Sequence, residues 1–139
     1  MMDALPLRLN PGDDLRGAVE QALLDHGATA GYLLQGIGSL RVAQIRYAGL
    51  AQPTELLGDL EILTLAGSVA PDGAHLHMMV SDARGRVFGG HVGRGCIVRT
   101  TAELLLAILP AHRFSRSHDP RTGFAELEVQ AADSHKMGG

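Results

Sequence analysis

The sequence predicts a single α+β domain, built mainly on an antiparallel β-sheet with one helix near the N-terminus. Strand-like apolar segments follow one another along the chain with short turns between them, and only one segment has the apolar spacing of a helix. No repeat, linker or low-complexity stretch divides the 139 residues. With 45% hydrophobic and 19% charged residues, a chain of this length can bury a core of its own.

The helix is predicted directly after a short strand at residues 5–9. Asn10-Pro11-Gly12 breaks this strand, and either Asp13 or Asp14 can cap the helix that follows. Gly27 is a suitable left-handed residue to end the helix. Between these signals the apolar residues recur at helical spacing, at Leu15, Val19, Ala22 and Leu23.

From Thr29 onward the pattern favours strands, at residues 32–35, 40–47 and 61–69, the first of them ending at Gly36-Ile37-Gly38-Ser39. Residues 96–109 are ambiguous, because Thr100-Thr101-Ala102-Glu103 is compatible with a helix start whereas Ile97-Val98 favours a strand. A turn at 119–123 leads into a last strand at 125–129. We therefore place the domain at residues 5–129 and a flexible C-terminal tail at residues 130–139.

Three of the seven histidines, His75, His77 and His91, fall within seventeen residues. In a strand His75 and His77 point to the same face, and His91 comes with the next strand. A four-residue turn between the strands would point His91 away, whereas a three-residue turn, Ala83-Arg84-Gly85, places it directly opposite His77. Three converging imidazoles are a ligand set for zinc or a related transition metal. The alternative is that they are ordinary hydrogen-bonded histidines of a hairpin.

Other polar residues have simpler interpretations. Cys96, the single cysteine, is interpreted as a small buried residue, and the serines lack a nucleophile-elbow context. Glu61 and Glu103 lie inside apolar strands and are either paired structural acids or general acid–base candidates. The remaining histidines are expected to be solvated: His26, His112, His118 and His135.

The charge distribution does not favour a nucleic-acid footprint. The chain has 15 acidic and 12 basic residues and a net charge of −3. Proteins that bind duplex DNA usually carry a basic excess. Arginines do gather near the histidine segment, and we interpret them as solvated strand-edge residues: Arg84, Arg86, Arg94 and Arg99. Residues 1–14 lack the character of a signal peptide and the apolar run 104–109 is too short for a bilayer, so we expect a cytoplasmic protein without a membrane segment.

Several motifs taken together resemble the PPC domain, the plants and prokaryotes conserved domain also called DUF296. The match covers about residues 5–129. The motifs that carry it are Pro11-Gly12-Asp13-Asp14-Leu15, Gly36-Ile37-Gly38-Ser39-Leu40, Leu60-Glu61-Ile62-Leu63-Thr64-Leu65-Ala66-Gly67, Pro71-Asp72-Gly73-Ala74-His75-Leu76-His77, Gly85-Arg86-Val87-Phe88-Gly89-Gly90-His91, Gly95-Cys96-Ile97-Val98, Thr100-Thr101-Ala102-Glu103-Leu104 and residues 114–123. The resemblance implies a homotrimer and a strand, not a helix, at residues 96–109. The fold is also similar to that of acetolactate decarboxylase, a zinc enzyme, which implies His75, His77 and His91 as metal ligands.

The resemblance leaves two kinds of function open. Plant members of the family carry an AT-hook and are nuclear DNA-binding regulators, while prokaryotic members stand alone and are often named as DNA-binding. This chain has no Arg-Gly-Arg-Pro hook, which disfavours direct DNA binding. The first expectation is therefore a DNA-binding, regulatory or scaffolding module, linked to DNA through partners, with a three-histidine zinc site. The alternative is a zinc-dependent enzyme that acts on a small carbonyl or carboxylate molecule.

Overall fold

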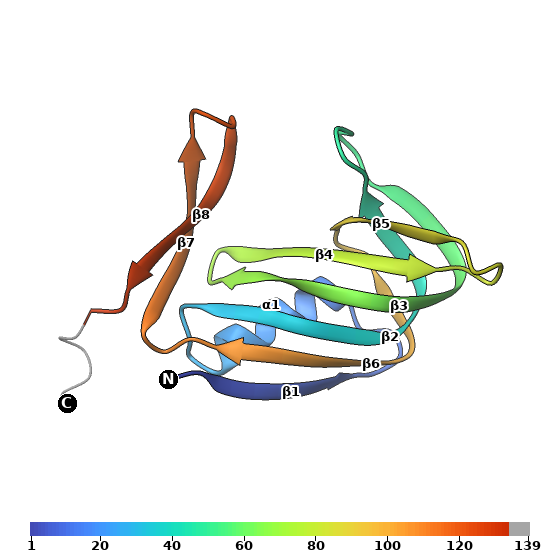
Figure 1. The fold of residues 1–139 in the computed structure, drawn as a ribbon. Coiled ribbons are helices and arrows are strands. Elements are labelled where there is room, and N and C mark those ends of the chain that lie inside the picture. The colour runs from blue at the N-terminus through green and yellow to red at the C-terminus, as the bar shows by residue number, and fades with distance from the viewer. Residues whose placement is uncertain (134–139) are drawn as a thin grey trace.

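A computed structural model of the chain describes residues 1–133 and confirms the predicted α+β class. Six strands form one sheet in the order β1-β6-β2-β3-β4-β5, all neighbours being antiparallel, and β7 and β8 form a separate hairpin (Figure 1). The elements are β1 (Asp3–Leu9), α1 (Leu15–Asp25), β2 (Gly31–Arg46), β3 (Thr54–Ala70), β4 (Gly73–Ser81), β5 (Val87–Val92), β6 (Ile97–Ile108), β7 (His112–Asp119) and β8 (Phe124–Ala131).

Helix α1 covers one face of the sheet and supplies its side of the core. Asp14 is the N-cap, because its Oδ2 accepts the amide hydrogen of Gly17 at 2.8 Å, and Gly27 has a φ of 69° just beyond the helix. The buried residues of the helix pack against large aliphatic side chains from the inner face of the strands: Leu15, Val19 and Leu23 against Leu33, Leu65, Leu76 and Leu106. Burial of this apolar stripe holds the helix on the sheet.

The long strands differ in extent from the sequence prediction. Residues 31–46 form one strand, β2, without the predicted break at Gly36-Ile37-Gly38-Ser39. Gly36 is buried, and a Cβ there would lie 2.5 Å from Cδ2 of Leu104, so the glycine permits close packing within the sheet. Residues 97–108 form strand β6, which settles the ambiguity there in favour of a strand.

Strand β5 pairs with two neighbours and so curls the sheet back on itself. It lies along β4, and its end also pairs with β2, with Ile45 opposite Val92 and Arg46 opposite His91. Gly90 makes this possible: a Cβ there would lie 2.6 Å from the carbonyl oxygen of Arg46. The close approach brings Arg46, distant in sequence, beside one of the three histidines.

The β7–β8 hairpin stands away from the sheet and rises on one side of β4, as the β2–β3 connection does on the other (Figure 1). Its turn is the one predicted at residues 119–123, with Gly123 at a φ of 79° and its amide donating to the Asp119 carbonyl at 2.8 Å. Strand β8 runs to Ala131, and residues 134–139 of the predicted tail lie outside the described residues. Among residues 1–133, no helix has the length and apolarity that a membrane crossing requires.

Candidate metal centre

Strands β4 and β5 bring the three histidines to one face of the sheet, opposite to the face that α1 covers. His77 lies directly across from His91, as the three-residue turn predicts. The amide of Asp82 donates to the carbonyl of Arg86 at 3.0 Å, and Gly85 takes the left-handed conformation with a φ of 74°. His75 is two residues before His77 and shares its face. The sequence prediction of the register is therefore confirmed.

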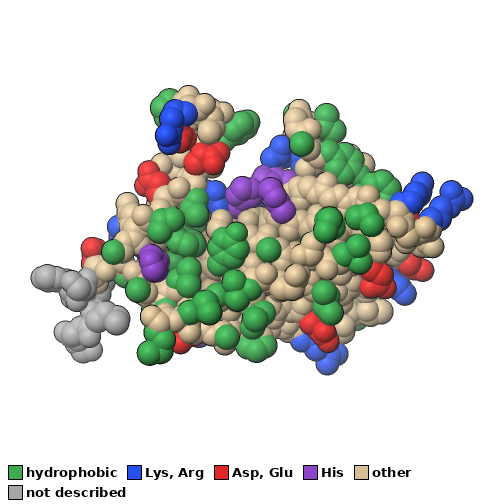
Figure 2. Space-filling view, in the orientation of Figure 1, with side chains coloured by type: hydrophobic (Ala, Val, Ile, Leu, Met, Phe, Trp, Pro, Cys, Tyr) green, Lys and Arg blue, Asp and Glu red, His purple; other side chains and the backbone are tan. Residues whose placement is uncertain are grey.

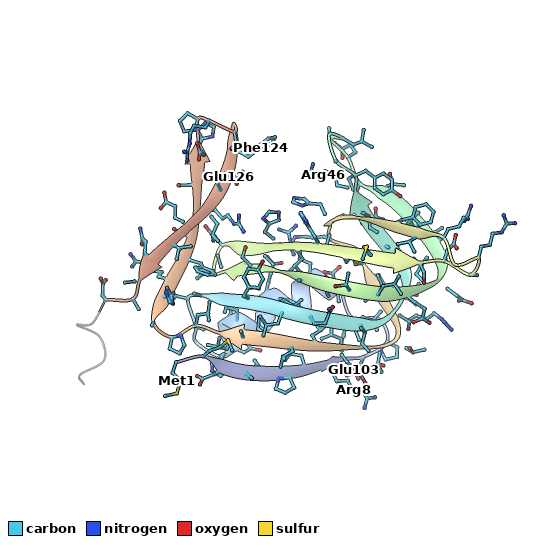
Figure 3. All side chains as sticks on the ribbon, viewed as in Figure 1. Met1, Arg8, Arg46, Glu103, Phe124 and Glu126 are labelled. Atoms are coloured by element: carbon cyan, nitrogen blue, oxygen red, sulfur yellow. The ribbon has the colours of Figure 1, made fainter. Side chains whose placement is uncertain are left out.

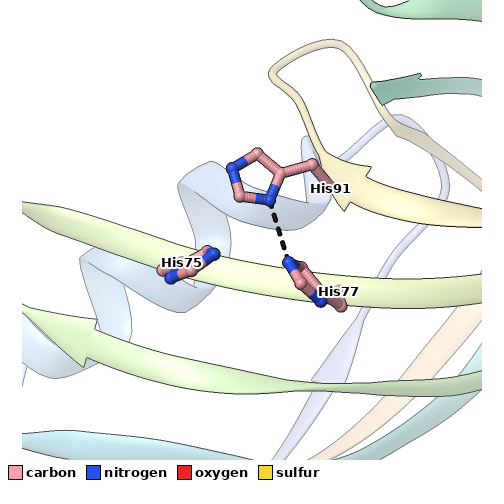
Figure 4. Close-up of side chains that lie close together, drawn as sticks. All are labelled: His75, His77 and His91. Atoms are coloured by element: carbon pink, nitrogen blue, oxygen red, sulfur yellow. Dashed lines mark hydrogen bonds between the residues drawn. The ribbon is translucent and has the colours of Figure 1, made fainter. Parts of the chain in front are cut away.

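The three imidazole rings contact one another (Figure 4). Their centroids are 4.6 to 5.0 Å apart, and Nε2 of His77 lies 3.0 Å from Nδ1 of His91. One nitrogen of each ring can be chosen so that all three lie within 4.8 Å of one another. His75 and His91 are half-buried, while His77 is exposed. The cluster thus has one protected side and one side open to solvent.

The surroundings of His75 and His91 favour the neutral form of these two imidazoles, because both have a lowered pKa. Burial, followed by the charges of His75 and Arg46, lowers the pKa of His91 to about 4. The pKa of His75 is lowered as well, first by burial and then by the charge of Arg116. A neutral imidazole keeps the lone pair that a metal needs, so these two histidines are ready to coordinate at neutral pH.

This electrostatic arrangement predicts the titration of His91 in the metal-free protein. We expect NMR of its ring Cε1–H to give a pKa of about 4. Between about pH 4 and the ordinary pKa of 6.5, the unfolded chain binds more protons at this histidine than the folded chain does. The free energy of unfolding therefore increases with pH over this window and decreases as the pH falls through it. Thermal unfolding from pH 7 to pH 4 measures the loss. A His91 that titrates near its ordinary value would contradict the predicted burial effect.

A cavity of about 910 Å³ opens beside His75 and His91. Figure 2 shows the histidines at its base, between the β7–β8 hairpin and the β2–β3 connection. Figure 3 shows Phe124 and Glu126 on the hairpin side and Arg46 on the opposite side. The remaining polar lining comes from α1 and β7, which contribute Arg16 and Arg116.

The arginines of the cavity were not found by sequence analysis. Arg16, Arg46 and Arg116 belong to three different elements, and no motif or spacing connects them. Three of the four arginines that cluster in sequence are engaged elsewhere, Arg86 with Asp82 at 2.7 Å, Arg94 with Glu20 at 2.8 Å and Arg99 with Asp59 at 3.3 Å. Arg84 is exposed on the turn between β4 and β5. Only tertiary structure distinguishes the two groups.

The other singled-out residues lie outside the cluster. Cys96 is fully buried, and burial raises the pKa of its thiol to about 11, which confirms its interpretation as a small core residue. Glu61 and Glu103 are exposed and do not line the cavity. Three of the other histidines are exposed as predicted: His26, His112 and His118. His135 lies outside the described residues.

The histidine cluster fits a zinc-class ion by its donor set. Three imidazole nitrogen donors on adjacent strands suit Zn²⁺, and tetrahedral bonds of about 2.0–2.1 Å place ligand nitrogens roughly 3.3 Å apart. The 3.0 Å separation of the His77 and His91 nitrogens is close to that value, and the third imidazole needs only a small side-chain adjustment. Three protein ligands leave a fourth position for another molecule.

Fold and cluster together define a single-domain α+β protein with three imidazoles on the outer face of its sheet. The chain belongs to the Plants and Prokaryotes Conserved (PCC) domain family, whose model matches residues 1–110. This confirms the family resemblance.

Solved structures show the same fold. A hypothetical protein from Salmonella is 36% identical with a TM-score of 0.91, over 94% of this chain and 95% of that one. The metal-containing protein AF0104 from Archaeoglobus fulgidus is 28% identical with a TM-score of 0.78, over 91% and 93%. A Ralstonia eutropha protein, provisionally named as DNA-binding, is 22% identical with a TM-score of 0.78 over 90% of both chains.

Among curated proteins, a protein from a Synechococcus strain named bifunctional protein GlmU is 48% identical over 125 residues. The match covers 90% of this chain but only 20% of that protein. The chain thus spans about a fifth of the length of this relative.

Proposed function

We propose that the protein is a metal-dependent enzyme for a small molecule, with zinc held by His75, His77 and His91. The observation that carries this proposal is the convergence of three imidazole nitrogens within 4.8 Å at the base of a cavity. The name of the Archaeoglobus fulgidus protein, metal-containing, supports it. When bound, zinc would supply a Lewis acid that polarises a carbonyl or carboxylate oxygen.

The chain's own residues supply the remaining chemistry. Glu126 is the single carboxylate among the residues that line the cavity, and Thr122 donates to it at 3.3 Å. It faces the cavity from β8 and can accept or return a proton of a bound molecule. Leu50 and Phe124 add apolar surface to the walls of the cavity.

Metal analysis of untagged protein tests the proposal directly. We expect about one zinc per chain after purification without chelator, because three histidines at this spacing bind zinc tightly. Negligible zinc in the wild-type protein, also after incubation with zinc and desalting, would refute a zinc-dependent function.

A regulatory or scaffolding role associated with DNA is the second candidate. It is supported by the provisional naming of the Ralstonia eutropha protein and of a structure from Bacteroides thetaiotaomicron as DNA-binding. The net charge of −3 argues against direct contact with duplex DNA. We expect no gel shift of duplex DNA at low salt. A shift that weakens steeply as salt is raised would favour the DNA-binding role instead.

We also propose a homotrimer, as the resemblance implies, located in the cytoplasm. Support comes from the outer face of the sheet, where Figure 2 shows apolar side chains gathered. Strands β2, β3, β4 and β6 carry six large apolar side chains that are between 37% and 49% exposed, an unusual density for a monomer surface: Tyr32, Leu34, Ile37, Leu63, Met79 and Leu105.

The trimer predicts a specific effect of charge on this face. Leu34→Arg should lower the mass measured by light scattering from that of three chains to that of one, because a buried unpaired charge is costly at an interface. Leu24→Arg, on the exposed side of α1, is the matched control and should leave the mass unchanged. A wild-type protein that runs as a monomer would contradict the trimer.

A further inference from the structure

We propose that the cavity beside the three histidines is an anion site, and that its ligand is a small organic molecule bearing a carboxylate or phosphate group held by Arg46 and Arg116. The inference deepens the proposed function by naming the class of substrate, and it rests on that function for the role of the metal. The placement of the two arginines does not depend on the metal, because it follows from their own hydrogen bonds.

Arg46 is fixed on the β5 side of the cluster. It lies opposite His91 in the β2–β5 ladder, so the two side chains leave the same face of the sheet. Its Nη1 donates to the carbonyl of Leu50 at 3.2 Å, which orients the guanidinium at the cavity wall. Its remaining N–H groups are available to a ligand.

Arg116 is fixed on the opposite side, near His75. Its Nη2 donates at 2.7 Å to Oγ of Ser68, and Ser68 is the ladder partner of His75. The backbone amide of Arg116 donates to Asp72 at 3.1 Å and anchors β7 at this place. Ser68 is buried, so this guanidinium is held beside the cluster and is not a mobile surface group.

The charges of Arg46 and Arg116 are not balanced by ion pairs with protein carboxylates. Within residues 1–133 neither Arg46 nor Arg116 forms an ion pair with a carboxylate. Arg16 also lines the cavity and is ion-paired with Glu20 at 3.7 Å, although its buried Nε has no hydrogen-bond partner. Against Arg46 and Arg116 the described lining has one carboxylate, Glu126. Positive charge of this kind, placed next to a dication, favours an anionic ligand.

The apolar part of the lining indicates an organic anion. Leu50, Val92 and Phe124 line the same cavity as the arginines, and about 910 Å³ is far more than an inorganic ion needs. Guanidinium groups bind carboxylate and phosphate oxygens with paired N–H donors. The two arginines flank the histidines, so an anionic group held by them places the adjoining atoms of the molecule beside the metal site.

Isothermal titration calorimetry with malonate and glycerol 3-phosphate tests the site, using dimethyl malonate as the uncharged control. We expect at least one acid to bind both zinc-loaded and metal-free protein, and Arg46→Gln and Arg116→Gln each to weaken binding by at least tenfold. Arg84→Gln, on the exposed β4–β5 turn, is the matched control and should bind like wild type. The zinc content of all three variants should equal that of wild type.

The outcomes separate this proposal from the proposed function. Binding that depends on the arginines, in a protein that takes up no zinc even after incubation with zinc and desalting, would support the anion site and refute the zinc enzyme. Normal zinc content with no binding of either acid, or with binding that neither arginine variant weakens, would overturn the anion site alone. Equal binding of dimethyl malonate would overturn it as well. Where Arg116→Gln unfolds by circular dichroism, Arg46→Gln decides, since its side chain makes one hydrogen bond to a loop carbonyl.

Discussion

Replacing His77 by alanine should abolish stoichiometric zinc binding while leaving the fold intact. His77 is exposed, so its truncation creates no core cavity, and we expect a change in unfolding free energy within about 0.5 kcal/mol for the metal-free protein. The loss of one of three nitrogen donors should weaken zinc binding by at least about 100-fold, which is more than the loss of an outer-shell partner costs. Elemental analysis after desalting and a competition titration with a chromogenic chelator measure both quantities.

The control for this experiment is another exposed histidine that lies outside the cluster. His26→Ala serves, because His26 is exposed at the end of α1 and forms only backbone hydrogen bonds there. It should retain about one zinc per chain. Equal zinc content in His77→Ala and His26→Ala would mean that zinc binds elsewhere, and the role assigned to the cluster would be wrong. Comparison of the metal-bound and metal-free wild-type protein adds a second readout, since tight binding to the native state must raise the melting temperature.

The sequence was sufficient to predict the histidine cluster because its geometry is set locally. The i, i+2 spacing fixes His75 and His77 on one face of the strand. The three-residue turn that ends at Gly85 sets the register in which His91 lies opposite His77. The helix was predictable for the same reason, since its cap at Asp14 and its apolar spacing lie within one short segment.

The rest of the site depends on contacts between distant parts of the chain. Arg46 reaches the cluster through the β2–β5 pairing, and Arg116 through a hairpin that follows β6. No residue near either arginine in the sequence indicates its place. Local patterns showed only a different cluster of arginines, three of which are paired elsewhere. The glycines of β2 misled in a related way: they permit close packing within a long strand and do not end it.

Gly90 connects the fold to the site, and its replacement by alanine should damage both. A Cβ at this position would lie 2.6 Å from the carbonyl oxygen of Arg46 and 3.0 Å from Cγ2 of Ile45, and the backbone has a φ of 159°. Because a backbone carbonyl cannot move aside as a flexible side chain can, β5 must separate from β2. We expect a loss of about 2–4 kcal/mol in unfolding free energy, as for other overpacked or strained positions, measured by urea denaturation.

Gly49→Ala is the control that isolates the steric part of this effect. Gly49 also has a positive φ, 77°, but a Cβ there would meet nothing within 4 Å. Gly49→Ala should therefore lower the unfolding free energy by only about 1 kcal/mol, the cost of a left-handed backbone conformation for alanine. Since β5 carries His91 and the β2 contact places Arg46 beside it, Gly90→Ala should also weaken zinc and malonate binding, whereas Gly49→Ala should leave the zinc affinity unchanged. Equal stability losses in the two variants would show that the close approach of β5 to β2 does not hold the site together.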